Sequence, residues 1–141
     1  MARTLESLAD TRQLARTLLE YAPPGTLLVL AGPLGAGKTT LVQALGLALG
    51  SAAHVSSPTY TLIHEYPTPA GVLVHIDAYR LGDADALFEL GLDDYLERAR
   101  LTAVEWGEGL LTTFPDALVV RLSLTDGVRR AAVSRGGIEF V

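Results

Sequence analysis

Apolar residues recur at two different spacings along the first third of the chain, and these spacings predict alternating helices and strands. Over residues 7–22 they fall at helical intervals, with Ser7 placed to cap the helix. The short continuous apolar run at residues 26–32 is typical of a strand buried on both faces. Residues 38–49 then predict a second helix that ends at Gly50. Strand, glycine-rich loop and helix in this order open an α/β unit.

The remainder of the chain predicts mainly strands, with one helical stretch. Residues 83–100 predict one or two short helices interrupted by Gly91. The segment PTPA favours a hairpin between the strands predicted at residues 59–66 and 71–77. The segment TDG favours a closing hairpin between the last two predicted strands. Together the elements predict an α/β fold with a mixed, mainly parallel sheet flanked by helices. The predicted strands are residues 59–66, 71–77, 101–106, 117–124 and 128–134.

The composition of the chain excludes several classes of protein and of function. The 141 residues, 49% of them hydrophobic, predict a single domain over residues 1–141. No apolar run of 18 residues predicts a membrane span, and the polar N-terminus does not resemble a signal peptide, so a cytoplasmic location is expected. The absence of cysteine excludes disulfides and thiolate chemistry. A formal net charge of −5 disfavours nucleic-acid binding by the chain alone.

The glycine-rich loop carries the clearest chemistry. The segment GPLGAGKT, residues 32–39, matches the phosphate-binding pattern G-x-x-x-x-G-K-[ST] and predicts a P-loop NTPase-like three-layer fold. Glycines let backbone N–H groups converge on phosphate oxygens, and the helix that follows adds its N-terminal donors. Lys38, the only lysine of the chain, supplies a compact positive charge, and the Thr39 hydroxyl is a hard oxygen ligand for Mg²⁺.

A second protein ligand for Mg²⁺ is expected at the end of a neighbouring strand, and two residues qualify. Asp77 and Glu105 both end apolar runs, although each could instead cap the next helix or face solvent. Thr59, just before a predicted strand, could sense a γ-phosphate or belong to an ordinary turn. The chain contains no asparagine, which excludes the guanine-reading motif N-K-x-D and favours ATP.

The histidines and the arginines of the last hairpin give weaker signals. His54, His64 and His75 lack metal-ligand spacing on a shared helix face, and the sequence favours structural roles for all three. Arg129 and Arg130 could stack on a base or lie in solvent, and solvent is slightly favoured.

Five segments occur in the order and spacing of the bacterial TsaE (YjeE) proteins, and the chain resembles that family over nearly its whole length. The glycine loop is shared by many ATPases, whereas S-P-T-Y, H-x-D-x-Y-R and E-W in combination are specific. The resemblance implies a small ATPase needed for threonylcarbamoyladenosine beside the anticodon of tRNAs. It implies that the chain acts with the TsaB–TsaD heterodimer, which carries the transferase site, and that ATP binding and hydrolysis reset this complex. Because the chain is acidic, we expect tRNA to be brought by these partners. The segments are GPLGAGKTTLVQAL, VSSPTYTLIHEY, VHIDAYRL, LGLDDYLE and AVEWGE.

The resemblance also implies roles for individual residues. Glu105 corresponds to the Mg²⁺-linked glutamate, Thr39 to the Mg²⁺-binding threonine, and Asp77 to the aspartate needed for hydrolysis as base or water-orienter. Thr59 corresponds to the switch-like threonine. The terminal segments match weakly, so the residues that contact adenine stay open. The phosphate-binding segment corresponds to Gly35, Ala36, Gly37, Lys38, Thr39 and Thr40.

The runner-up hypothesis is a small-molecule kinase built on the same loop. Such an enzyme needs an acceptor pocket and an arginine-bearing lid, and no insertion here is long enough to form one. Arg98 and Arg100 are the only close arginine pair before the last hairpin. A nucleotide-dependent binding module with negligible catalysis is a third possibility.

Overall fold

The computed structural model describes residues 2–51, 63–79 and 84–140, and its centre is a mixed β-sheet. The strands lie in the order β1-β7-β6-β2-β5-β4-β3, and β8 pairs with residues 133–135 of β7. The four central strands, β6, β2, β5 and β4, run parallel, and the outer pairings are antiparallel. The strands are β1 (Arg3–Thr4), β2 (Thr26–Ala31), β3 (Ile63–Tyr66), β4 (Leu73–Asp77), β5 (Leu101–Glu105), β6 (Leu118–Thr125), β7 (Val128–Arg135) and β8 (Ile138–Phe140).

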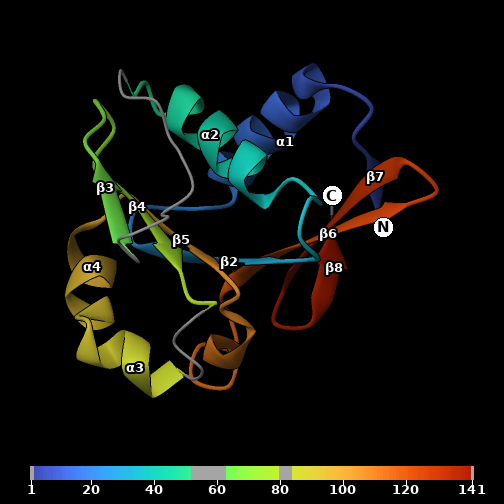
Figure 1. The fold of residues 1–141 in the computed structure, drawn as a ribbon. Helices are drawn as coiled ribbons and strands as arrows, with labels where there is room; N and C mark the ends of the chain where they lie inside the picture. Colours follow the sequence, from blue (N-terminus) through green and yellow to red (C-terminus); the bar gives the residue numbers. More distant parts are fainter. Residues whose placement is uncertain (1, 52–62, 80–83, 141) are drawn as a thin grey trace.

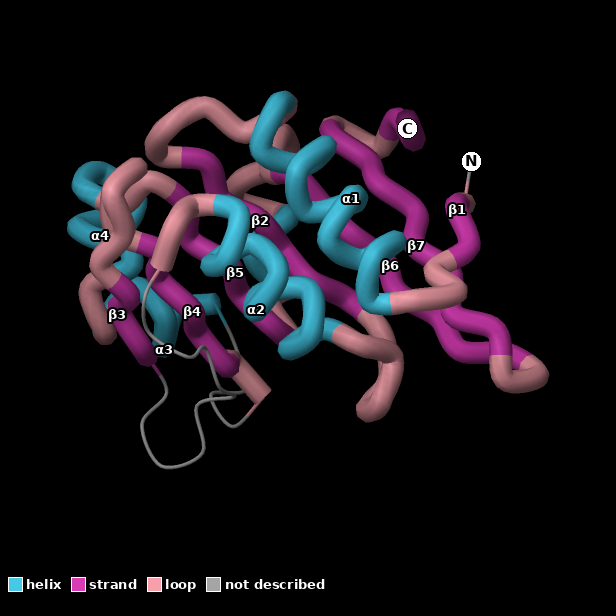
Figure 2. The backbone as a smooth tube through the Cα atoms, turned by 90° about the horizontal axis from the view of Figure 1, so that it is seen from above, coloured by secondary structure: helices cyan, strands magenta, loops and turns pink. Residues whose placement is uncertain are grey.

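Helices cover both faces of this sheet and complete three layers (Figure 1). One face carries α1 (Leu8–Glu20) and α2 (Lys38–Ala48), which lie side by side across the parallel strands (Figure 2). The opposite face carries α3 (Ala84–Glu89), α4 (Leu92–Arg98) and the short 3₁₀ helix η1 (Glu108–Leu111). Each face has its own hydrophobic cluster. The three-layer, P-loop NTPase-like fold predicted from the sequence is confirmed.

Local signals account for several element boundaries. The Ser7 side chain accepts a hydrogen bond from the Asp10 backbone N–H and caps α1, as predicted. Helix α2 ends at Ala48, and the chain reverses at the predicted Gly50, whose φ is 88°. Gly91, with a φ of 95°, separates α3 from α4. Helix-ending glycines were therefore reliable guides to the helices.

The closing hairpin was also predicted correctly. Strands β6 and β7 pair antiparallel along their whole length, and Asp126 and Gly127 join them. Both turn residues have positive φ, 54° and 75°, as a two-residue hairpin turn requires. The edge strands β1 and β8 were not predicted, because two or three residues carry too little periodicity.

The topology brings three strand ends to one edge of the sheet. Strand β2 lies between β5 and β6 in parallel register, and five of its six residues are buried. Leu30 of β2 and Asp77 of β4 both pair with Glu105, the last residue of β5. The carboxyl ends of β2, β4 and β5 therefore meet where the glycine loop begins. No helix in the described ranges is long and apolar enough to cross a membrane.

Candidate functional site

The glycine loop connects β2 to α2, and its backbone conformation requires glycine at two positions, Gly32 and Gly37. Gly32 has a φ of 143°, and a Cβ there would lie 2.4 Å from the carbonyl oxygen of Leu122. Gly37 has a φ of 105° and begins α2 without a side-chain hydrogen bond to the first turn. The N–H groups of that turn therefore lack a capping side chain, and together with the helix dipole they favour an anion.

Lys38 is the first residue of α2, and its ammonium group is held inside the loop. Nζ donates a hydrogen bond to the carbonyl oxygen of Gly32, 2.5 Å away, and lies 3.6 Å from the centre of the Trp106 ring. Burial lowers the pKa of Lys38 below its ordinary value of 10.5, and the nearby carboxylates of Glu105, Glu108 and Asp77 oppose that shift. The Lys38 ammonium thus lies near several acidic groups.

Thr39, Glu105 and His75 meet next to this lysine. The Thr39 hydroxyl lies 3.4 Å from Oε2 of Glu105, and His75 Nε2 lies 2.5 Å from the same oxygen. Glu105 is 5% exposed and His75 is completely buried. Of the two acidic residues that the sequence singled out, Glu105 is the one in contact with the threonine of the glycine loop.

Asp77 lies beside Glu105 on the neighbouring strand, in direct register. It is partly exposed, and its Oδ1 accepts a hydrogen bond from the backbone N–H of Tyr79, 3.0 Å away. This contact caps the turn after β4, which differs from the helix cap and the solvent-facing position that the sequence offered as alternatives to catalysis. The carboxylate nevertheless lies near enough to Lys38 to influence its pKa, so the position is compatible with both roles.

Trp106 adopts a backbone conformation that is costly for its residue type. Its φ of 62° is left-handed, which costs on the order of 1–2 kcal/mol outside glycine. Its ring contacts the Lys38 ammonium on one side and lies 5.2 Å, centre to centre, from the Tyr79 ring. Backbone strain of this kind concentrates at functional sites, and here it directs an aromatic ring at the loop lysine.

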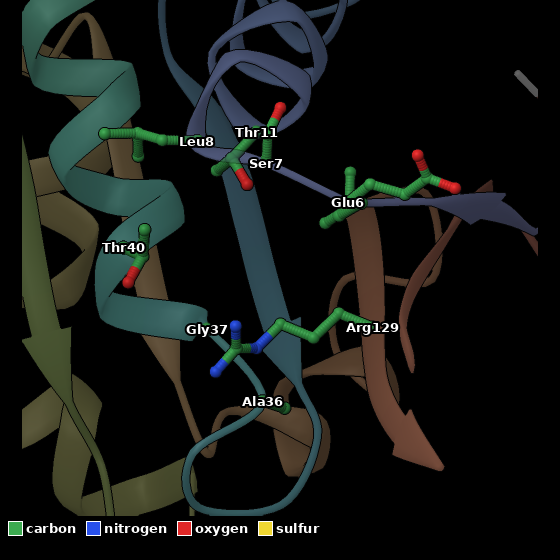
Figure 3. A pocket seen from close by; sticks show the side chains of 9 residues that line it. Glu6, Ser7, Leu8, Thr11, Ala36, Gly37, Thr40 and Arg129 are labelled. Atoms are coloured by element: carbon green, nitrogen blue, oxygen red, sulfur yellow. The ribbon is translucent and has the colours of Figure 1, made fainter. Parts of the chain in front are cut away.

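A cavity of about 290 Å³ opens on the α1 side of the glycine loop. Arg129 reaches from β7 toward the start of α2 (Figure 3), and its Nη2 lies 3.4 Å from the carbonyl oxygen of Gly35. The sequence slightly favoured solvent for Arg129; its side chain is exposed but lies against the loop. The cavity is lined by Leu5, Glu6, Ser7, Leu8, Thr11, Ala36, Gly37, Thr40 and Arg129.

The donor atoms present suit a cation that is bound together with a phosphate. Thr39 and Glu105 offer a hydroxyl and a carboxylate, the hard oxygen ligands that Mg²⁺ prefers. Within the described ranges no group of three or more histidine or acidic side chains forms a metal cage. Two protein oxygens fit Mg²⁺, which keeps several waters and shares phosphate oxygens. Two residues named from the sequence, Thr59 and His54, lie outside the described residues.

The chain is similar to known proteins in both sequence and fold. Residues 5–132 match the family model described as "Threonylcarbamoyl adenosine biosynthesis protein TsaE". The crystal structure of Bacillus subtilis YdiB superposes with a TM-score of 0.78 and 29% identity, covering 97% of this chain and 86% of that one.

Proteins named tRNA threonylcarbamoyladenosine biosynthesis protein TsaE are similar in sequence. The one from Bacillus subtilis is 40% identical over 69% of this chain and 60% of its own length. The one from Streptomyces coelicolor is 45% identical over 70% of this chain and 68% of its own, and the one from Haemophilus influenzae 35% identical over 84% and 76%. The family match, these identities and the shared fold establish that the chain belongs to the TsaE family.

Proposed function

We propose that the chain binds ATP with Mg²⁺ at the glycine loop and hydrolyses it in support of threonylcarbamoyladenosine formation on tRNA. The observation that carries this proposal is that Lys38, Thr39 and Glu105 lie together at the carboxyl end of β2. There the glycine loop leads into the first turn of α2. Its partners are the TsaB–TsaD heterodimer, which carries the transferase site and brings the tRNA. A cytoplasmic location fits this role.

The loop residues Gly35, Ala36, Gly37, Thr39 and Thr40 hold the phosphates through their backbone N–H groups and the first turn of α2. Lys38 interacts with the β- and γ-phosphates. Its ammonium contacts the Gly32 carbonyl and the Trp106 ring in this structure, so it exchanges these contacts for phosphate oxygens when ATP binds.

Thr39 and Glu105 hold Mg²⁺, which supplies charge neutralisation between the phosphate groups when it is bound. Asp77, beside Glu105 at the end of β4, orients the attacking water or accepts its proton. Thr59 acts as the γ-phosphate sensor implied by the family resemblance.

The cavity between the N-terminus of α1 and the glycine loop takes the nucleoside part of ATP. It borders the phosphate-binding residues Ala36, Gly37 and Thr40, and Leu5 and Leu8 give it an apolar side. The Arg129 guanidinium at its edge provides a planar cation of the kind that stacks on aromatic rings. This location explains why the base-contacting residues could not be named from a local motif: they come from opposite ends of the chain.

The contacts of Arg98 and Arg100 give no support to a kinase. Arg98, a candidate lid residue, is paired with Glu65 at 2.8 Å and with Asp94 at 2.9 Å on the molecular surface. Arg100 donates to the carbonyl oxygen of Ala22, 2.7 Å away. Both arginines therefore make contacts within the fold.

The proposed function predicts weak ATP hydrolysis by the isolated chain and acceleration by its partners. Phosphoryl transfer depends on positioning and on positive charge at the transition state. Here the loop lysine is bound to the Gly32 carbonyl and the Trp106 ring, and the acidic chain does not attract tRNA by itself. Steady-state phosphate release is measured alone, with TsaB–TsaD, and with tRNA added. Full activity of the isolated chain, unchanged by the pair, would defeat the proposal, as would tight tRNA binding without partners.

Trp106 fluorescence is expected to change on nucleotide binding. Trp106 is the only tryptophan, and its ring contacts the ammonium group that the phosphates attract, so binding removes a charge from its face. A titration with ATP and Mg²⁺ should give a saturable change, which added Mg²⁺ alone should not produce. An unchanged spectrum at saturation, with binding verified by calorimetry, would show that Lys38 keeps its contact with the ring.

A further inference from the structure

We propose that His75 is a positioning residue that holds the Glu105 carboxylate against Thr39 at the glycine loop. The inference rests on the proposed function, because Glu105 is there a ligand of Mg²⁺. The observation that carries it is the 2.5 Å contact between His75 Nε2 and Glu105 Oε2, made by two side chains that are almost completely buried.

Apart from His64 on the neighbouring strand, the described sheet neighbours of His75 are mainly apolar. On the face of the sheet covered by α1 and α2, its neighbours Leu73, Leu101 and Ala103 belong to the hydrophobic cluster. A polar ring in such a place lowers stability unless it is hydrogen-bonded. Its hydrogen bond goes to Glu105, at the functional edge of the sheet.

The two ring nitrogens of His75 are not equally satisfied. A carboxylate that binds Mg²⁺ is ionised and only accepts hydrogen bonds, so with Glu105 as a metal ligand the donor of this contact is His75 Nε2. Nδ1 is buried and has no hydrogen-bond partner within the described part of the chain. Packing alone does not explain an imidazole at this position, since an apolar side chain would leave no nitrogen unpaired. The donor at Nε2 is the property that distinguishes histidine here.

The geometry defines what the hydrogen bond does. His75 on β4 and Thr39 on α2 both contact Oε2 of Glu105, so neither donates to Oε1. Two contacts from different elements restrict rotation of the carboxylate. Without His75, the carboxylate is free to turn toward the Lys38 ammonium, which already feels its charge. His75 therefore keeps Glu105 available as a metal ligand, the function of hydrogen bonds behind metal ligands generally.

The test compares the Mg²⁺ concentration needed for half-maximal tightening of ATP binding, measured by calorimetry, across variants. His75→Leu keeps an apolar side chain of similar bulk but loses the donor, and we expect it to raise that concentration about 10- to 100-fold. ATP binding in EDTA should be unchanged, because the glycine loop is intact. His75→Gln restores an N–H donor at similar reach and should recover most of the Mg²⁺ response.

His64→Leu is the matched control, since His64 lies opposite His75 in the β3–β4 pair but bonds to the Tyr66 hydroxyl. A wild-type Mg²⁺ response in folded His75→Leu would overturn the inference. An equal loss of the Mg²⁺ response in His64→Leu and His75→Leu would also overturn it. Should His75→Leu not fold, His75→Asn, whose shorter amide does not reach Glu105, is compared with His75→Gln. Equal responses would refute the proposal.

Glu105→Gln separates this inference from the proposed function. Weakened Mg²⁺ dependence in Glu105→Gln together with a normal response in His75→Leu would refute the positioning role alone. A normal response in Glu105→Gln would overturn both the positioning role and the assignment of Glu105 as a metal ligand.

Discussion

Lys38→Ala is expected to weaken ATP binding by about 100-fold and to reduce kcat/KM for hydrolysis by roughly 10⁴-fold. Hydrogen bonds to charged groups contribute about 1.5–3 kcal/mol, and one lost donor at a developing charge typically costs a further 10²–10³ in rate. Lys38 is the only lysine, and its ammonium group is bound to the Gly32 carbonyl inside the glycine loop. Calorimetry is the appropriate binding assay, because removal of the lysine also changes the surroundings of Trp106.

Two further variants make the result specific. Lys38→Met keeps the apolar stem beside Trp106 without the charge and should lose activity to the same extent. Arg16→Ala removes an exposed cation from α1 and should behave as wild type. Lys38 belongs to neither hydrophobic cluster, so its loss should leave the circular dichroism spectrum intact. Wild-type hydrolysis by folded Lys38→Ala would refute the phosphate-loop assignment.

Asp77→Asn is expected to slow ATP hydrolysis by about 10²- to 10⁴-fold while leaving the affinity for ATP with Mg²⁺ nearly unchanged. A positioned general base contributes acceleration of this size, and an amide cannot accept the proton. The substitution is sharper than alanine, because the Asn Oδ1 can still accept the hydrogen bond from the Tyr79 N–H. Single-turnover hydrolysis and calorimetry measure the two quantities separately.

Asp77→Ala serves as the comparison, since it removes both the carboxylate and the turn hydrogen bond. If Asp77 only caps the turn, Asp77→Asn should hydrolyse ATP normally and Asp77→Ala should lose thermal stability. A variant that binds Mg²⁺ poorly yet hydrolyses at the normal rate when saturated would instead assign Asp77 to the metal and reverse its role with Glu105.

The parts of the site that lie close together in sequence were predictable, and the parts assembled across the sheet were not. The spacing of Gly32, Gly37, Lys38 and Thr39 specifies a local backbone, and the structure shows the required loop and helix. Glu105 and Asp77 were both selected because each ends an apolar run. The family resemblance favoured Glu105 as the Mg²⁺ ligand, and the strand order, with β5 between β2 and β4, shows how Glu105 comes to lie next to Thr39.

His75 and Arg129 show the limit of local patterns. Alternation with apolar residues favoured a structural role for His75 but could not reveal that its ring contacts a carboxylate thirty residues later. The sequence slightly favoured solvent for Arg129, with stacking on a base as the alternative. Its contact with Gly35 forms because the fold brings β7 close to the glycine loop. The sequence pattern alone does not show this proximity.

The central claim is that ATP bound at the glycine loop supports repeated turnover by the TsaB–TsaD pair. The most direct measurement counts threonylcarbamoyladenosine residues formed on tRNA per TsaB–TsaD heterodimer, with wild-type chain or with Lys38→Ala added at equal concentration. We predict many products per heterodimer with the wild-type chain and about one with Lys38→Ala, since the transfer itself is expected to need no ATP at this loop. Equal, multiple turnover with both chains would contradict the account.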